Sequence, residues 1–302
     1  MTALPVLAVT GSTGEVGGRV AARLAALGVA QRLVVRDPSR APALAGAQVV
    51  AAAGGYADGD GMRRALSGVH TVFLVSAQET PGRVEQHLTA VRAAVDAGVT
   101  RIVYTSYLAA APDATFTFAR DHFHTEEAIR AAGVRHTFLR NSMYLDFLPV
   151  MVGADDVIRG PAGDGRIAMV ARDDVADVAA AVLTGEGHDG RTYDVTGAEA
   201  LTMTELAAAL ARATGRPVTF HDETIEQAWA SRAHHGAPDF AVEGWVTSYA
   251  AIATGEMDVV SDTVRQVAGH PRSGWPRAWP PSVDGQPAAG ALCGASCAGG
   301  VG

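Results

Sequence analysis

The sequence predicts an α/β fold in which a parallel sheet is wound by helices on both faces. Short runs rich in Val, Ala and Leu alternate with longer segments of helical periodicity from residue 4 to about 140, which is the pattern of repeated βαβ units. The runs are almost continuously apolar, as strands covered on both faces require. The 302 residues, 48% of them hydrophobic, suffice for such a sheet together with a smaller lobe.

A glycine-rich turn after the first apolar run indicates a dinucleotide site. The segment 10–17 reads T-G-S-T-G-E-V-G and precedes a helix-patterned stretch that ends at Gly28. A diphosphate must approach the main chain closely where a strand turns into a helix, so that free N–H groups can hold it. Gly11, Gly14 and Gly17 give that access, and this placement makes the motif specific. We call residues 10–17 the glycine turn and predict a doubly wound sheet of the Rossmann type.

Further strands and helices follow in alternation. The helix expected over 84–97 has Leu88, Val91 and Val95 at helical spacing and ends at Gly98. A second helix is expected from about Arg120 to Ala132. The predicted strands cover residues 6–9, 32–35, 48–52, 71–75, 101–105 and 136–139.

Beyond Arg140 the pattern becomes mixed, and the turn cluster 160–165 indicates a smaller, interleaved C-terminal substrate lobe. Residues 173–178 open a helix with acids in its first turn, and 191–195 reads as another strand of the main sheet. Thr202 and Glu205 form a capping box at the head of a helix that runs to Thr214. We therefore expect a nucleotide-binding domain over 1–150 to which 166–200 returns, a substrate lobe mainly over 151–279, and a disordered tail over 280–302.

The second predicted strand is followed by Arg36, where a fold that prefers NAD carries an acid for the ribose 2′-hydroxyl. A guanidinium there favours a 2′-phosphate, so the sequence predicts NADP(H). Arg36 is expected to pair with the phosphate and stack on the adenine, with Arg40 as a second contact. The neighbouring acid Asp37 weakens this preference for NADP(H). The alternative for Arg36 is a solvated charge at a strand end.

Charge and composition exclude several other functions. The net charge of −8, without a run of Lys or Arg, argues against a nucleic-acid partner. The first strand begins too close to Met1 for a secretory leader, and no stretch has the ~20 strongly apolar residues of a membrane span, which predicts a cytoplasmic protein. No metal is expected. Two cysteines, Cys293 and Cys297, cannot supply a four-ligand site. The spacing of His122 and His124 prevents them from binding one ion together, and the adjacent His234 and His235 lack a spaced carboxylate.

Several short motifs carry a resemblance to a known family. They are the glycine turn, Arg36, Tyr104-Thr105-Ser106, Asp121-His122, Thr125-Glu126, Leu139-Arg140-Asn141 and Gly269-His270-Pro271. Over about residues 4–271 the chain resembles the atypical short-chain dehydrogenases/reductases of the NmrA-like class, and within it the bacterial type-two NAD(P)H:quinone oxidoreductases. The resemblance implies an NADPH-binding Rossmann domain, a small lobe over the nicotinamide, and hydride transfer to a quinone-like acceptor. Some NmrA-like proteins are redox sensors that catalyse nothing, and this alternative stays open.

The chain departs from the Ser, Tyr and Lys set with which the broader family reduces carbonyls. The Ser position falls near Tyr107, the Tyr position on Phe118 and the Lys position on His122. Ordinary ketone reduction is therefore disfavoured, whereas a quinone accepts hydride at low cost. His122 is expected to contact the nicotinamide ribose or to act as an acid, and Tyr107 to offer a phenolic proton. The alternatives are a histidine satisfied by its neighbours and a tyrosine that packs against the small lobe.

The remaining site residues are expected at the carboxyl edge of the sheet, where open α/β sheets bind ligands. Gly55 stands where similar proteins often carry an acid before the aromatic Tyr56, and Asp58 is displaced, so the adenine contact is expected to be shifted or lost. An apolar wall for a quinone ring is predicted from Phe118, Phe123, Met143 and Tyr144, with lobe packing as the alternative. The predicted cofactor contacts are Gly11, Ser12, Thr13, Gly14, Glu15, Val16, Arg36, Ser76, Ala77, Thr105, His122 and Asn141.

The leading hypothesis is an NADPH-dependent reductase of quinones or similar conjugated carbonyls, which acts by direct hydride transfer. One alternative is a non-catalytic NADP(H) sensor that docks on a partner protein. Another is a reductase that tailors an aromatic secondary metabolite. A small quinone-like molecule is the expected partner, and a homodimer is left open.

Overall fold

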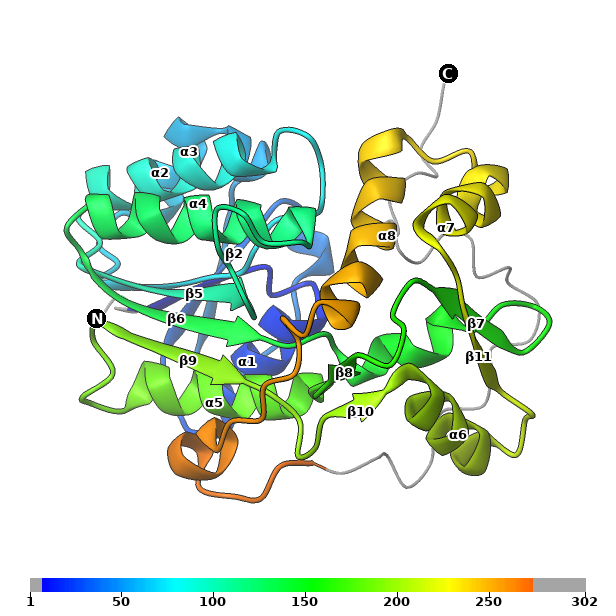
Figure 1. The fold of residues 1–302 in the computed structure, drawn as a ribbon. Helices are drawn as coiled ribbons and strands as arrows, with labels where there is room; N and C mark the ends of the chain where they lie inside the picture. Colours follow the sequence, from blue (N-terminus) through cyan, green and yellow to red (C-terminus); the bar gives the residue numbers. More distant parts are fainter. Residues whose placement is uncertain (1–6, 274–302) are drawn as a thin grey trace.

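The computed structural model describes residues 7–273, and a seven-stranded parallel sheet forms its centre (Figure 1). The strand order is β3-β2-β1-β4-β5-β6-β9. The chain starts at β1, runs outward to β3 and then crosses back to β4, so the direction of winding switches between β1 and β4, where open α/β sheets bind ligands. The strands are β1 (Leu7–Thr10), β2 (Gln31–Val35), β3 (Ala47–Ala51), β4 (Thr71–Leu74), β5 (Arg101–Tyr107), β6 (Arg135–Asn141) and β9 (Arg191–Val195).

Helices cover both faces of this sheet. On one face, α1 (Glu15–Ala26) packs against α5 (Arg172–Thr184), and on the other α2 (Gly59–Leu66), α3 (Arg83–Asp96) and α4 (Thr117–Ala131) lie in a row (Figure 1). Each face has its own buried apolar layer, built around Phe73 and Leu139 on one side and around Ile102 and Phe138 on the other. The predicted Rossmann-type sheet is confirmed, and β5 and β6 each extend two residues beyond their predicted ends.

The smaller lobe contains two short pairs of strands. β7 (Val157–Gly160) pairs in parallel with β11 (Thr219–Asp222), and β8 (Arg166–Ile167) pairs antiparallel with β10 (Leu201–Thr202). Between β8 and β10 the chain returns to the large sheet as α5 and β9, so the lobe is interleaved with it. The predicted capping box is present, with Glu205 N–H donating to Thr202 Oγ1 at 3.1 Å and Thr202 N–H to Glu205 Oε2 at 2.8 Å. The lobe helices are α6 (Met203–Thr214), α7 (Ile225–Arg232) and α8 (Asp239–Ala253).

Short turns of helix connect these elements. Helices of the 3-10 type cover Pro38–Arg40, Gly55–Ala57, Leu145–Met151 and Ala233–His235, and a π-helical turn covers Val264–Ala268. Among residues 7–273 no helix combines the length and the apolar character that crossing a bilayer requires. The predicted tail from residue 280, with both cysteines, lies outside the described residues.

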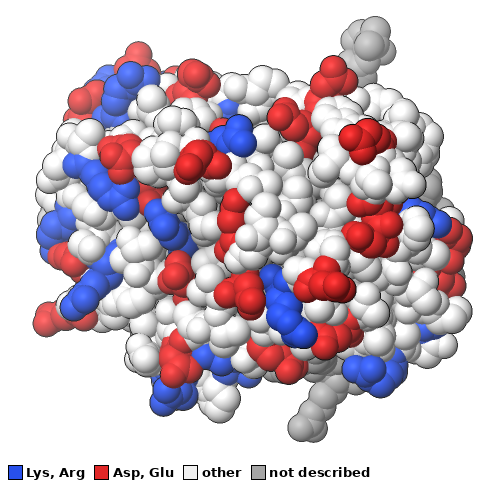
Figure 2. Space-filling view, viewed as in Figure 1, with Lys and Arg blue, Asp and Glu red and all other residues white. Residues whose placement is uncertain are grey.

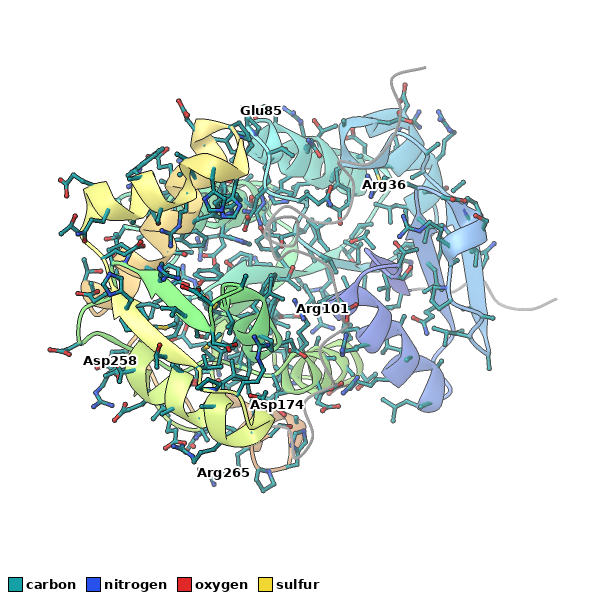
Figure 3. The ribbon with its side chains drawn as sticks, turned by 90° about the vertical axis from the view of Figure 1, so that its right-hand side faces the viewer. Arg36, Glu85, Arg101, Asp174, Asp258 and Arg265 are labelled. Carbon is teal, nitrogen blue, oxygen red and sulfur yellow. The ribbon has the colours of Figure 1, made fainter. Side chains whose placement is uncertain are left out.

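Charged side chains are interspersed over the surface. In Figure 2 acidic and basic groups are intermixed over much of the face shown, with mainly acidic groups at the upper right. Arg159 and Asp155 form one of the exposed ion pairs of the protein. A view from the side separates the two parts of the molecule: Arg36 lies near β2 at the sheet, and Asp258 lies across the view at the lobe (Figure 3).

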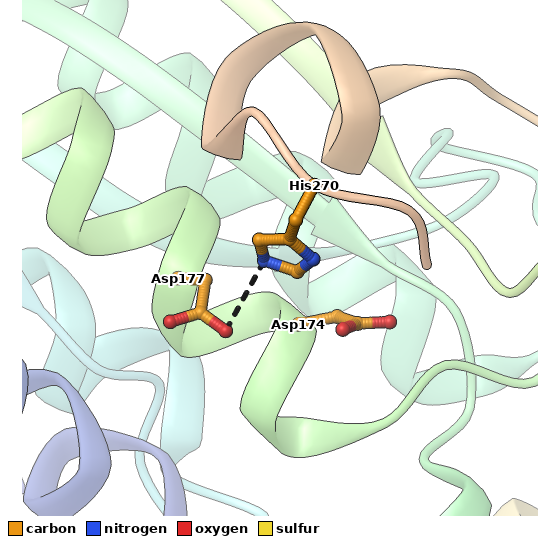
Figure 4. A group of neighbouring side chains, drawn as sticks. All are labelled: Asp174, Asp177 and His270. Carbon is orange, nitrogen blue, oxygen red and sulfur yellow. Dashed lines mark ion pairs between the residues drawn. The ribbon is translucent and has the colours of Figure 1, made fainter. Parts of the chain in front are cut away.

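The last described segment is held against α5 by three side chains (Figure 4). Asp174 is fully buried and accepts hydrogen bonds from the Ser273 N–H at 2.8 Å and the Ser273 hydroxyl at 2.6 Å. His270 Nε2 lies 3.4 Å from Asp177 Oδ2, and Arg23 donates to the same carboxylate. Asp174, Asp177 and His270 are close enough to share a metal ion. Both carboxylates already have protein partners, however, so anchoring of the chain accounts for the group.

Replacement of Asp174 is therefore expected to loosen this segment. We expect Asp174→Ala to lower the free energy of unfolding by about 2 kcal/mol, because two hydrogen bonds to a buried carboxylate are lost. Asp173→Ala, in the same turn of α5, is the control and should cost less than about 1 kcal/mol, because its ion pairs with Arg19 and Arg23 are exposed. Urea denaturation measures both values. Equal losses in the two variants would contradict the anchoring role.

Candidate functional site

A cavity of about 560 Å³ opens between the carboxyl ends of β4, β5 and β6 and the smaller lobe. Its volume lies within the range of roughly 300–1,000 Å³ that small-molecule sites occupy. The sheet contributes Ser76, Tyr107 and Ser142, and α8 contributes Trp245 and Tyr249. The cavity therefore combines the ligand-binding edge of the sheet with a wall from the lobe.

The glycine turn leads to the same edge of the sheet. α1 begins after Gly14, which has an extended backbone and no side chain that caps the first N–H groups. Gly11 has a φ of 62°, and a Cβ built on Gly17 would lie 2.3 Å from the carbonyl oxygen of Gly11. Ser12 is buried, and its Oγ has no hydrogen-bond partner within the described residues. This open helix N-terminus with a glycine-lined backbone fits a diphosphate.

The flanking residues also fit a nucleotide. Arg36 follows β2 and is exposed, and Asp37 does not pair with it: the Asp37 carboxylate accepts hydrogen bonds from the Ser39 N–H at 2.9 Å and the Ser39 hydroxyl at 2.7 Å. A Cβ on Gly55 would lie 3.3 Å from Arg36 Cδ, so this glycine makes room for the arginine stem. Tyr56 anchors the glycine turn to the neighbouring strand, because its hydroxyl bonds Thr10 Oγ1 and the Val75 carbonyl. The displaced Asp58 accepts a hydrogen bond from the Gly61 N–H and caps α2.

Beneath the cavity, Arg83 and His122 form a buried pair. Arg83 is 3% exposed; its Nε donates to the Ala77 carbonyl at 3.0 Å and its Nη2 to His122 Nε2 at 3.1 Å. A guanidinium can only donate, so a neutral His122 carries its proton on Nδ1, which lies 2.9 Å from the Tyr104 hydroxyl. Burial first, and then the charge of Arg83, lower the pKa of His122 well below its ordinary value.

This pairing bears on the expected role of His122. The ring is neutral at physiological pH, and both of its nitrogens are engaged by the protein. It has no free N–H with which to protonate an acceptor or hold a ribose hydroxyl in this arrangement. The sequence predicted that His122 lies at the site, and His122 does line the cavity. The sequence could not show that Arg83 would donate a hydrogen bond to His122 Nε2.

His87 holds the same segment from another side. The Ala77 N–H donates to His87 Nε2 at 2.8 Å, and His87 Nδ1 lies 2.8 Å from the Thr125 hydroxyl, which donates to the Asp121 carbonyl. Burial lowers the pKa of His87 to about 3. Both polar groups of the Ala77 backbone are thus fixed. The sequence analysis did not predict a role for Arg83 or His87. The one feature of the sequence that points to them is their position at the start of the helix that follows the fourth strand.

Tyr107 presents a phenol to the cavity from the end of β5. Its ring stacks on His122 at 6.0 Å between centroids and packs against Phe116 at 5.0 Å. Within the described residues its hydroxyl has no hydrogen-bond partner. Burial first, and the carboxylate of Glu79 second, raise the pKa of Tyr107 above its ordinary value, so the phenol keeps its proton at neutral pH. The arrangement can donate a hydrogen bond to an oxygen in the cavity.

The predicted apolar wall is found in part. Phe118, Met143 and Tyr144 line the cavity, whereas Phe123 is absent from its lining and packs edge-on against His124 at 5.6 Å. Phe123 follows His122 by one residue, which turns it by about 100° around α4. The structure therefore places Phe123 outside the lining of the cavity. The sequence also missed wall residues from distant segments, which are Phe116, Phe147, Trp245 and Tyr249.

The other predicted cofactor contacts lie at the glycine turn and the strand ends. Thr105 accepts a hydrogen bond from the Ser76 N–H at 2.8 Å, and Asn141 is buried with its Oδ1 unpartnered within the described residues. Asn141 Nδ2 donates to the Tyr144 hydroxyl at 3.3 Å. At the start of α1, Val16 is buried, while Thr13 and Glu15 are exposed, the latter paired with Arg19.

Comparisons with known proteins agree with this geometry. Residues 5–237 match the model of the NmrA-like family. Quinone oxidoreductase 2 of Escherichia coli is 34% identical over 88% of this chain and 94% of its own length. A (4-alkanoyl-5-oxo-2,5-dihydrofuran-3-yl)methyl phosphate reductase of Streptomyces griseus is 37% identical over the same shares. The crystal structure of an Escherichia coli NADPH-dependent quinone oxidoreductase with NADPH has a TM-score of 0.81 and 33% identity, and it covers 89% of this chain and 96% of that one. The chain belongs to the NmrA-like family.

Proposed function

We propose that this protein is an NADPH-dependent oxidoreductase that transfers hydride to quinones or similar conjugated carbonyl compounds. The observation that carries the proposal is the cavity in which a free phenol, Tyr107, meets aromatic walls at the ligand-binding edge of the sheet. The relatives support it, since one is named a quinone oxidoreductase and the solved structure of such an enzyme holds NADPH.

The residues present support binding of the cofactor at its diphosphate, its 2′-phosphate and its nicotinamide half. The N–H groups at the glycine turn would hold the diphosphate, and Arg36 would pair with the 2′-phosphate. Ser76 and Asn141, at the ends of β4 and β6, would contact the nicotinamide half. When bound, NADPH supplies the hydride.

The chain's own residues then orient the acceptor. Phe118 and Tyr144 offer faces for offset stacking of a flat ring, and the apolar lining excludes water. The Tyr107 hydroxyl donates a hydrogen bond to the carbonyl oxygen on which negative charge develops. Addition of one hydride converts the quinone to the hydroquinone monoanion. One proton from water then converts this anion to the hydroquinone. His122 stays neutral and takes no proton in this sequence.

The basic test is turnover by the purified protein. We expect loss of NADPH absorbance when benzo- or naphthoquinones are added. A non-catalytic sensor would bind NADPH and fail to oxidise it with every quinone of the panel, and that result would replace the proposal with the sensor alternative.

Cofactor choice is expected to depend on Arg36. We expect Arg36→Ala to weaken NADPH binding about tenfold to a hundredfold, because a charge-assisted contact to the 2′-phosphate is lost. NADH binding should weaken much less, because NADH loses only the stacking of Arg36 on the adenine. Arg40→Ala is the matched control and should have a smaller effect. Fluorescence titration with both nucleotides measures the change. Equal affinities of the wild type for NADH and NADPH would refute the role of Arg36.

Acceptor reduction is expected to depend on the Tyr107 hydroxyl. We expect Tyr107→Phe to lower kcat with quinones about tenfold or more, with NADPH affinity unchanged. Tyr193→Phe is the control, because Tyr193 lies on β9 and bonds His188 away from the cavity. Because the environment raises the Tyr107 pKa, the wild-type rate should show no loss from ionisation of this phenol up to about pH 10. An unchanged kcat in Tyr107→Phe would remove Tyr107 from the reaction.

A further inference from the structure

A glycine inside α8 touches one wall of the cavity. Gly244 lies near the middle of α8, where glycine is unfavourable relative to alanine. A Cβ built on Gly244 would lie 2.3 Å from Cε2 of Phe118 and 2.9 Å from its Cζ. Such separations are shorter than real Cβ contacts, so the Phe118 ring rests directly on the backbone of α8.

A second glycine contacts another aromatic side chain of the cavity in the same way. Gly160 ends β7, and a Cβ there would lie 2.4 Å from both Cγ and Cδ1 of Tyr249. Phe118 and Tyr249 are 7% and 6% exposed, and both line the cavity. Each ring occupies space that any larger residue at the glycine would need.

Phe118 has little room to move away from the cavity. Phe116 packs edge-on against it at 5.6 Å between centroids, and the guanidinium carbon of Arg83 lies 6.0 Å from its centroid. Arg83 is itself fixed by hydrogen bonds to Ala77 and His122. A side chain at position 244 would therefore push the ring into the empty space of the cavity.

We propose that Gly244, together with Gly160, determines how large an acceptor ring the cavity admits. By leaving the Phe118 and Tyr249 rings seated on bare backbone, the two glycines keep the cavity wide enough for acceptors of more than one fused ring. The proposal rests on the proposed function for the nature of the acceptor. It concerns the walls of the acceptor cavity and leaves the glycine turn untouched, so cofactor binding there is expected to be unaffected.

The test compares Gly244→Ala with the wild type on quinones of one, two and three fused rings. Binding to the full-length protein loaded with NADP⁺ is followed by quenching of tryptophan fluorescence, since Trp245 lines the cavity. We expect the affinity for the three-ring quinone, relative to the one-ring quinone, to fall about tenfold in Gly244→Ala. The ratio of kcat/KM values should fall in parallel, and NADPH affinity should stay the same.

Two further variants separate this effect from a loss of folding. Glu243→Ala, on the exposed side of the same helix, should leave the ratio unchanged. Phe118→Leu removes the ring that the new methyl group would strike, so it should raise the ratio, and adding Gly244→Ala to it should cost little. If Gly244→Ala alone does not fold, the comparison of Phe118→Leu with the double variant still tests whether Gly244 acts through the Phe118 ring.

The outcomes distinguish this inference from the proposed function. A ratio that is the same in the wild type, folded Gly244→Ala and Phe118→Leu overturns the inference. A wild type that binds the quinones but oxidises NADPH with none of them overturns the proposed function, while the binding ratio still decides the role of Gly244.

Discussion

The site depends on the burial of one guanidinium, that of Arg83. A buried charge is costly unless it is paired and hydrogen-bonded, and Arg83 finds its partners in the Ala77 carbonyl, the His122 ring and the Asp121 carboxylate at 3.6 Å. These contacts of Arg83, which lies at the start of α3, hold the segment after β4 and helix α4 in one arrangement. The floor of the cavity is therefore set by a requirement of the fold before any ligand binds.

This arrangement also changes the chemistry that the site can perform. In the Ser, Tyr and Lys set of the broader family, a cation lowers the pKa of a tyrosine that gives up its proton. Here the position of that lysine holds a neutral histidine, and the environment of Tyr107 raises its pKa. Such a phenol is suited to donate a hydrogen bond and poorly suited to release its proton. The site thus matches acceptors that take hydride at low cost and need little help from a proton donor, such as quinones.

The parts of the structure that the sequence predicted are those with local causes. Strands appeared as apolar runs, the capping box at Thr202 depended on residues three apart, and the glycine turn joined one strand to one helix. Phe123 was misplaced because a step of one residue along a helix turns a side chain out of the site. Arg83 and His87 were missed because their partners lie about 40 residues away in α4, and Tyr249 because only the packing of α8 brings it to the cavity.

The cofactor and the acceptor are expected to contact different parts of the molecule, so the choice of acceptor can vary independently of cofactor binding. The proposed cofactor contacts come from the glycine turn and the strand ends, whereas Gly244, Trp245 and Tyr249 come from one lobe helix. α8 meets the sheet domain mainly at α4, so a change along α8 moves the acceptor wall without touching the glycine turn. Two relatives of similar identity to this chain are named for different substrates, a quinone and an oxo-dihydrofuranyl methyl phosphate. A lobe helix that supplies Trp245 and Tyr249 to the wall, and on whose backbone Phe118 rests, gives a physical route to such divergence.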